Sequence, residues 1–234
     1  ILYYPTPYSA IPVESVTNPD NDVYFLGKGK NRLTEIIDAY ERFTQNGLKC
    51  DFNLVGVPGK QQVYKDDIHY IKSMPYRENL SRASRSKCLL EILQKNAKGY
   101  TPRMWEAILL GKKIITNNPI VRYSPFYDER YVSIFTDTKK LDTDFIRANP
   151  DLKIDYHYID QLSPRHLLEF ITARRLLALA EGLAEWFDRY RPEAAGIERV
   201  FAQHNLHSVM DTAQASGVAA LVAARRGLDV SFHT

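Results

Sequence analysis

Short apolar runs alternate with helix-like segments through the first two thirds of this chain. The run at 23–27 ends in glycine, and apolar residues then recur at helical spacing until Gly47. The same order repeats, and further strands are expected at 50–56, 68–74, 88–93, 112–118 and 132–135, with helices at about 77–86 and 101–110. Apolar strands that are separated by helices predict a parallel sheet covered on both faces. The expected fold class is α/β, with a Rossmann-like layered sheet.

The last part of the chain carries a second strand and helix pattern. A helix is expected at 174–190, and an earlier helix at 164–172 could run on into it. Strands at 194–201 and 229–233 flank an alanine-rich helix that ends at Gly227. A helix between two strands predicts a βα(β) unit.

Composition changes abruptly near residue 172. Residues 1–172 hold fourteen lysines and ten arginines, whereas residues 173–234 hold seven arginines and no lysine. Alanine changes at the same place, from six residues to thirteen. Lysine and arginine serve equally well on most protein surfaces, so the loss of lysine near residue 172 says nothing about the fold. It indicates two sequence histories, and we expect two domains, at 1–172 and 173–234.

The remaining bulk properties exclude few functions. No run of about 18 apolar residues is present, and the first residues lack the pattern of a signal peptide, so we expect a cytoplasmic protein without a transmembrane segment. Cys50 and Cys88 lie in apolar, strand-like stretches, which favours two buried reduced thiols over a disulfide. A formal net charge of +3 is too small to indicate nucleic-acid binding by itself.

Two stretches of the first piece, residues 1–172, have the features of a ligand site. In parallel sheets, ligands lie at the carboxyl ends of the strands, close to helix N-termini. The turn at 27–32 places Lys28, Lys30 and Arg32 before a helix, where charge and backbone N–H groups could hold a diphosphate. A solvated charged turn is an equally good interpretation of this pattern.

The second stretch is the helix expected at 101–110. Thr101 can cap this helix, and Arg103 and Glu106 lie three residues apart on one of its faces. An arginine for phosphate and a carboxylate for sugar hydroxyls would then face one crevice. An i,i+3 ion pair on the surface is the alternative, and the spacing alone favours it.

The motifs FLGKGKNRLTEII, FNLVG and CLLEILQKNAKGYTPRMWEAILLGKKIITNNP carry a family resemblance. Over residues 18–172 the chain resembles the C-terminal half of GT-B glycosyltransferases of capsule and lipopolysaccharide synthesis. The resemblance implies binding of a nucleotide diphosphate sugar without a metal or other cofactor. The residues to which it assigns donor binding are Lys28, Arg32, Thr101, Arg103 and Glu106. The family's first motif glutamate would fall on Lys98, and its acceptor-binding half is absent, so an incomplete enzyme is expected.

One acidic residue stands out in the second piece, residues 173–234. Glu198 lies in the strand expected at 194–201, close to apolar neighbours. A lone carboxylate on the face of a sheet costs free energy unless it is paired or bound to a metal. The simpler interpretation, which the residues alone favour, is a surface glutamate at the end of a strand.

The stretch LLALAEGLAEWFDRYRPEAAGIERVFAQHNLHSVMDTAQASGVAALVAARRGLDVSFHT resembles the middle of RuvC, a bacterial family of Holliday-junction resolvases. The resemblance implies an RNase H-like fold and cleavage of branched DNA by four carboxylates that hold two Mg²⁺ ions. Glu198 matches the family's second carboxylate and would be its catalytic and magnesium-binding residue, while Phe201 and Asn205 match the loop that approaches DNA. The other three carboxylates have no counterpart, so an incomplete RNase H-like segment is expected. Gly196 and Asp211 also depart from the family pattern.

Three functions follow from these patterns. The first is a glycosyltransferase of cell-surface polysaccharide synthesis, or its donor-binding half. The alternative is a RuvC-like fragment that binds branched DNA or pairs with another chain but cannot cut alone, and the third is a composite chain that is inert or partly disordered. The first piece is expected to be the more stable, and apolar surface on the second makes self-association plausible.

Overall fold

The computed structural model describes residues 13, 16, 18–94, 97, 99–198 and 206–233, with the backbone alone at residues 198 and 206–211. The chain divides into two compact units, the first unit (Ile1–Ser163) and the second unit (Pro164–Thr234). The point where the composition changes, near residue 172, therefore lies within the second unit.

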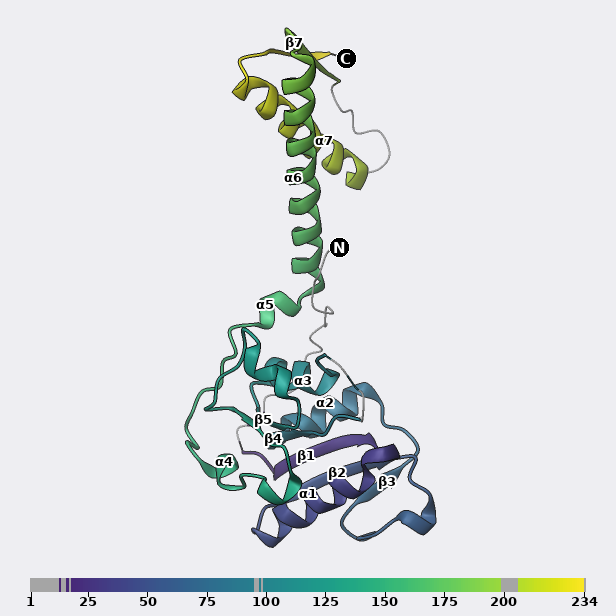
Figure 1. Ribbon diagram of the computed structural model, residues 1–234. Coiled ribbons are helices and arrows are strands. Elements are labelled where there is room, and N and C mark those ends of the chain that lie inside the picture. The colour runs from purple at the N-terminus through teal and green to yellow at the C-terminus, as the bar shows by residue number, and fades with distance from the viewer. Residues whose placement is uncertain are drawn as a thin grey trace. The chain divides into compact units, whose positions relative to one another are not determined.

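A six-stranded sheet forms the centre of the first unit (Figure 1). Its strands are β1 (Asn21–Lys28), β2 (Cys50–Val55), β3 (His69–Ile71), β4 (Ser86–Glu91), β5 (Lys113–Thr116) and β6 (Val132–Ile134). Their spatial order is β3-β2-β1-β4-β5-β6, and every neighbouring pair is parallel. The chain adds strands outward from β1 in one direction and then from β4 in the other. The junction of β1 and β4 is therefore the place at which open α/β sheets bind ligands.

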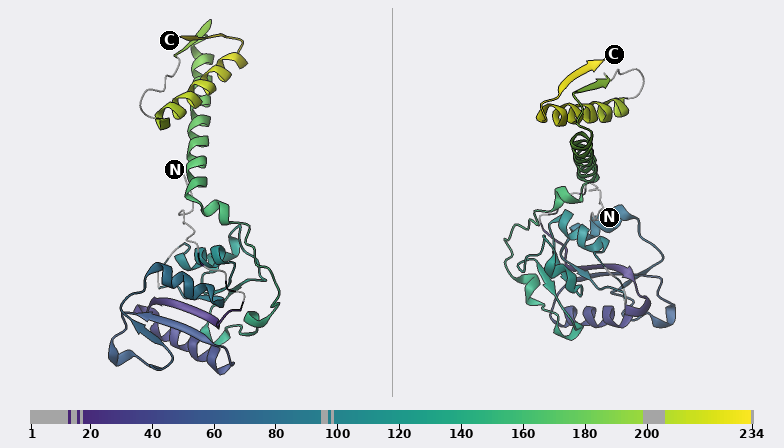
Figure 2. Two further views of the ribbon diagram at one scale, coloured as in Figure 1. Left: turned by 180° about the vertical axis from the view of Figure 1, so that it is seen from behind. Right: turned by 45° about the horizontal axis from the view of Figure 1, so that its top comes forward.

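Helices cover both faces of this sheet. They are α1 (Leu33–Gln45), α2 (Tyr76–Ser84), α3 (Pro102–Leu110), α4 (Asp144–Arg147) and α5 (Ile159–Leu162), with 3₁₀ turns η1 (Lys30–Arg32), η2 (Gly59–Gln61), η3 (Pro119–Tyr123) and η4 (Thr138–Lys140). Helix α1 lies on one face, and α2 and α3 lie on the other (Figures 1 and 2). The expectation of an α/β fold with a parallel sheet between helices is confirmed.

The alternation of side chains along each strand divides the core into two layers. In β1, Val23 and Phe25 pack in the layer that contains Ile36 of α1. Tyr24, which lies between them in the sequence, packs in the opposite layer with Met104 of α3. Both faces of the central strands are therefore buried, which is why their sequences are continuous apolar runs.

Local sequence signals define both ends of α3. The hydroxyl of Thr101 accepts a hydrogen bond of 3.1 Å from the backbone N–H of Arg103, and Pro102 occupies the first turn. Gly111 ends the helix with a φ of 57°, in the left-handed region that favours glycine. The expected cap at Thr101 is confirmed, and it fixes where the side chains of α3 lie.

Three strands, β3, β5 and β6, are shorter than the sequence pattern predicts. β3 and β6 hold three residues each, and they are the two outer strands of the sheet. β5 is an inner strand and still holds four of the seven residues expected at 112–118, so position in the sheet does not account for the difference. The stretch expected at 68–74 contains His, Lys and Ser, and three of its residues are paired.

The second unit is built from one long helix and a small βαβ arrangement (Figure 2). Its elements are α6 (Pro164–Tyr190), β7 (Ala194–Glu198), α7 (Leu206–Arg225) and β8 (Asp229–His233). β7 and β8 are parallel, and α7 connects them and contacts both. The helices expected at 164–172 and 174–190 are a single helix, α6. The expected strand ends at Glu198, and its predicted continuation lies outside the described residues.

The core of the second unit is small. Among its described residues, Phe187, Val222 and Ala223 are the buried apolar side chains. The partly buried side chains around them are Ala180, Leu183, Ala184, Ala195, Val218, Leu228 and Val230. Arg226 also donates to the carboxylate of Asp188 at 2.8 Å, which ties the end of α7 to α6. The relative stability of the two units remains a prediction.

Cys50 and Cys88 are free thiols of the first unit. Burial raises the pKa of both, and that of Cys50 to about 12. Both therefore stay protonated at neutral pH. Along the described part of the chain, each helix is too short or too polar to cross a membrane.

Candidate functional site

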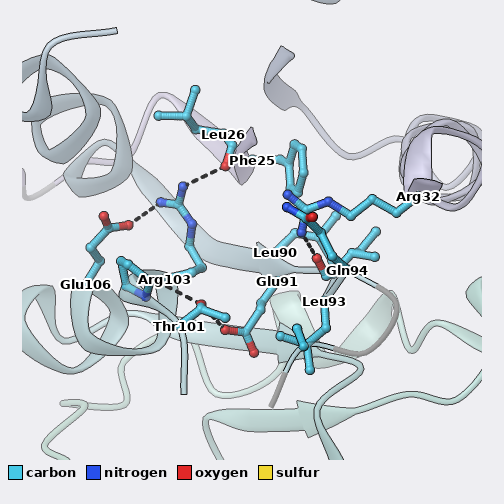
Figure 3. A pocket seen from close by; sticks show the side chains of 13 residues that line it. Phe25, Leu26, Arg32, Leu90, Glu91, Leu93, Gln94, Thr101, Arg103 and Glu106 are labelled. Atoms are coloured by element: carbon cyan, nitrogen blue, oxygen red, sulfur yellow. Dashed lines mark hydrogen bonds and ion pairs between the residues drawn. The ribbon is translucent and has the colours of Figure 1, made fainter. Parts of the chain in front are cut away.

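A cavity of about 620 Å³ lies at the carboxyl edge of the central sheet, where β1 and β4 are neighbours (Figure 3). Its polar lining comes from α3, from the end of β4 and from Arg32, which precedes α1. Phe25, Leu26, Leu90 and Ile92 give it apolar walls. The cavity thus occupies the position that the strand order favours for a ligand.

Arg103 and Glu106 form an ion pair on α3, with Nη1 and Oε2 2.5 Å apart. Their side chains are 10% and 4% exposed, so the pair is buried and is not the surface pair that the spacing favours. Nη2 of Arg103 also donates to the carbonyl oxygen of Leu26 at 3.1 Å. Both residues line the cavity, and Figure 3 shows them joined to each other along its wall.

Two residues that the sequence analysis did not select complete this network. The side-chain amide of Asn79 donates to Oε1 of Glu106 at 2.8 Å, and the hydroxyl of Tyr24 donates to Oδ1 of Asn79 at 3.0 Å. The guanidinium of Arg103 lies 5.1 Å from the centre of the Tyr24 ring, and burial raises the pKa of Tyr24 above its usual value. Arg103 and Glu106 therefore satisfy each other and hold the cavity wall in place.

Glu91 is a second buried carboxylate of this cavity, at the end of β4. Its two carboxylate oxygens accept hydrogen bonds from the hydroxyls of Thr101 and Thr116. Burial raises the pKa of Glu91, while these hydrogen bonds act in the opposite direction. Glu91 thus links the N-terminal cap of α3 to the end of β5. The signal in the sequence was an acidic residue inside the apolar run CLLEIL.

Arg32 reaches into the cavity from the basic turn. Its Nε donates to the carbonyl of Lys28 at 3.1 Å, and its Nη1 donates to the carbonyl of Ile92. No carboxylate among the described residues forms an ion pair with it, and burial lowers its pKa. A Cβ on Gly27 would lie 2.7 Å from Nη2 of Arg32, so glycine leaves the room that this guanidinium occupies. Lys28 is exposed and does not line the cavity.

The candidate residues of the second unit lie at or beyond the end of β7. Glu198 is the last residue of that strand, and its backbone lies opposite His233 of β8. Phe201 and Asn205 lie outside the described residues. Within the described ranges, no three His, Cys, Asp or Glu residues gather in a way that could hold a metal ion. These residues by themselves do not fit the magnesium site that the resemblance implies.

Comparison with known proteins finds similarity in the second unit. Residues 167–234 match the family described as "Crossover junction endodeoxyribonuclease RuvC". The RuvC protein of Saccharopolyspora erythraea is 63% identical over 60 residues, which cover 26% of this chain and 30% of that protein. The RuvC protein of Thermobifida fusca is 58% identical over 60 residues, and that of Mycobacterium tuberculosis is 56% identical over 62. The chain spans about a third of the length of these relatives, 33% for each of the latter two.

These findings confirm the resemblance of the second piece to RuvC and overturn the expected main function. The glycosyltransferase interpretation is wrong, because the family match and the relatives' names point to RuvC, and nothing found supports a GT-B half or a nucleotide sugar partner. The physical reason lies in the motifs. A basic turn before a helix and a capped helix with an Arg–Glu pair are local features of many α/β units, and fold-level features do not specify a reaction.

Proposed function

We propose that the second unit acts in the processing of branched DNA, as part of a RuvC-type Holliday-junction endonuclease. The observation that carries this proposal is that the family match, residues 167–234, extends over nearly the whole of that unit. A cytoplasmic location is part of the same proposal, because the substrate would be chromosomal DNA.

The arrangement of the second unit is suited to phosphate binding at one edge. The carboxyl ends of two parallel strands meet there, and α7 begins after β7 at the same edge. Helix N-termini attract phosphate groups. We assign Glu198 to the catalytic carboxylate position, and Phe201 and Asn205 to DNA contacts. No metal-dependent step is assigned to the described residues, since they do not form a magnesium site.

DNA binding is testable with a gel shift at low salt. The full chain is expected to bind a four-way junction more tightly than a linear duplex of the same sequence and length. Arg174 and Arg175 of α6 are two exposed, adjacent cations within the matched segment, so we choose them as candidate phosphate contacts in addition to the strand edge; replacing both by alanine is expected to reduce the slope of log K against log salt by about 2. The matched control removes the exposed Lys72 and Arg77 of the first unit and should leave this slope unchanged.

Two results would contradict the proposal. One is equal affinity for the junction and the duplex. The other is the same loss of binding in both double variants, which would mean that net charge alone governs the interaction.

We also infer that the cavity at the carboxyl edge of the first unit binds a small organic anion. The observation that favours it is Arg32, a half-buried guanidinium that forms no direct ion pair with a described carboxylate and feels the charge of Glu91 only from across the cavity. An unpaired charge in a partly apolar cavity is costly unless a ligand supplies the opposite charge. We assign Arg32 to contact with the anionic group of the ligand. Thr101, Arg103 and Glu106 form the cavity wall beside the ligand, and Lys28 lies outside the cavity on the path by which the ligand enters.

Phenyl phosphate is a suitable probe for this cavity, because it joins a dianion to an apolar ring. At one hundred times its Kd, phenyl phosphate is expected to raise the free energy of unfolding of the first unit by about 2.7 kcal/mol. The melting temperature should rise accordingly. Arg32→Met should remove most of this effect, whereas Arg77→Met, at an exposed position of α2, should keep it. An unchanged melting temperature of the unmodified chain at millimolar probe would refute the assignment.

A further inference from the structure

A second cavity of the first unit lies at the opposite edge of the sheet, where β4 and β5 begin. Its volume is about 390 Å³. Four cationic residues line it, Lys87, Lys112, Lys113 and Arg147, and its described lining includes no carboxylate. The cavity at the carboxyl edge differs in this respect, because two arginines and two glutamates line it. The second cavity therefore carries an excess of positive charge.

Two of these four cations already have partners within the fold. The ammonium of Lys113 is buried and donates to the carbonyl oxygens of Phe145, Ile146 and Ala148. Lys87 forms an ion pair with Asp22, with Nζ and Oδ1 2.8 Å apart. Lys113 thus holds the segment around α4 against β5, and most of the charge of Lys87 is compensated.

The other two cations keep hydrogen-bonding capacity. Nη2 of Arg147 donates to the carbonyls of Asn46 and Gly47 at 2.7 and 3.3 Å, which engages one of its two terminal nitrogens. Lys112 is half-buried, and the structure records no hydrogen bond or ion pair of its ammonium with any described residue. Burial lowers the pKa of Lys112, and no neighbouring carboxylate opposes this effect.

We propose that this cavity binds the phosphate group of a small molecule, with Lys112 as the principal contact and Arg147 as the second. Two cations with free donors match the charge of a phosphate dianion, and phosphate oxygens accept bonds from both ammonium and guanidinium groups. The apolar side chains of Ile146, Leu152 and Ile154 complete the cavity wall and can contact a small organic residue.

The position of Lys112 favours a small phosphate over DNA. The hydroxyl of Tyr156 donates to the backbone carbonyl oxygen of Lys112 at 2.7 Å. A Cβ added to the neighbouring Gly111 would lie 3.2 Å from the carbonyl oxygen of Ile154. The backbone at this place is therefore enclosed by the loop around residue 154. A duplex presents its phosphates on a convex surface, which does not reach a half-buried ammonium in a concave site.

Isothermal titration calorimetry of the full chain tests the proposal, with sodium chloride used to hold the ionic strength constant. Inorganic phosphate and glycerol phosphate are the two probes, and they distinguish the free ion from a phosphate ester. Lys112→Gln is expected to weaken binding of the preferred probe at least tenfold, and Lys112→Arg to restore most of it. Lys60→Gln removes an exposed lysine elsewhere in the same unit and should have no effect.

Arg32→Met serves as the background for these titrations, because it removes the anion binding expected at the other edge of the sheet. Phosphate binding that remains in this background and is lost when Lys112→Gln is added to it would support the assignment. Equal affinity in Lys112→Gln and Lys60→Gln would overturn it. A loss of duplex DNA binding in Lys112→Gln without any phosphate binding by the unmodified chain would also overturn it, because the cavity would then belong to a DNA-binding surface.

A measurement on the unmodified chain covers the case in which Lys112→Gln fails to fold. Acetic anhydride modifies lysines at rates that mass spectrometry can follow residue by residue. Phosphate at saturating concentration is expected to slow the acetylation of Lys112 at least fivefold and to leave Lys60 unchanged. The same rate for Lys112 with phosphate and with chloride would rule out a phosphate bound at this ammonium.

Discussion

Replacing Glu106 by alanine is expected to lower the free energy of unfolding of the first unit by about 3–5 kcal/mol. The change leaves the buried guanidinium of Arg103 without its carboxylate and the amide of Asn79 without its acceptor. Arg103 cannot lose its charge, so the cost of an uncompensated buried cation stays in the folded state. Urea unfolding, followed through the midpoint and its slope, measures the loss.

The matched control for this experiment is Glu78→Ala. Glu78 pairs with Arg82 within α2, as Glu106 pairs with Arg103 within α3, but its side chain is 48% exposed against 4% for Glu106. Its removal should cost about 0.3–0.5 kcal/mol. A loss for Glu106→Ala no greater than that for Glu78→Ala would show that the pair is solvated, and the network with Asn79 and Tyr24 would then have no structural role.

Phe187→Ala is expected to unfold the second unit while the first unit stays folded. Truncating a buried phenylalanine costs about 3–5 kcal/mol, and a single small core rarely supplies more than that amount of stability. Phe187 is the largest of the three buried side chains described in this unit, so little else can compensate for its loss. Junction binding in the gel shift should disappear with the fold.

Hydrogen exchange resolved along the full chain measures this effect directly. Amides of β7, α7 and β8 should lose protection in Phe187→Ala, whereas amides of β1 and β4 should keep it. Leu177→Ala is the control on the same helix, because Leu177 is 51% exposed and its loss should leave exchange nearly unchanged. Retained protection in β7 and β8 would mean that contacts beyond this small core hold the unit together.

Much of the fold of the first unit was predictable from the sequence. The apolar runs at β1, β2, β4 and β5 identify strands that are buried on both faces. The helices between the strands return the chain to the starting edge of the sheet, so the strands run parallel. Thr101 and Pro102 locate the start of α3, because capping depends on residues adjacent in the chain. The pattern was less informative about strand length at β3 and β5, which are both shorter than expected.

The candidate site was only partly predictable. The sequence indicated Arg32, Arg103 and Glu106, and all three line one cavity. It did not indicate Glu91 or Asn79, whose partners lie ten or more positions away along the chain. The interpretation of Arg103 and Glu106 as either ligand contacts or a surface pair missed the third possibility, a buried pair. Local motifs also led to a glycosyltransferase function that the comparisons contradict.

The sequence by itself determined the order of strands and helices, the cap of α3 and the similarity of residues 167–234 to the RuvC family, because each is carried by residues within one stretch of the chain. Only the tertiary structure decided which charges are compensated. Lys112 and Lys113 are adjacent and chemically alike, yet one ammonium is held by three carbonyl groups and the other faces a cavity. That difference arises from the loop around residue 147, which is distant in sequence and reaches the start of β5 only through the packing of the sheet.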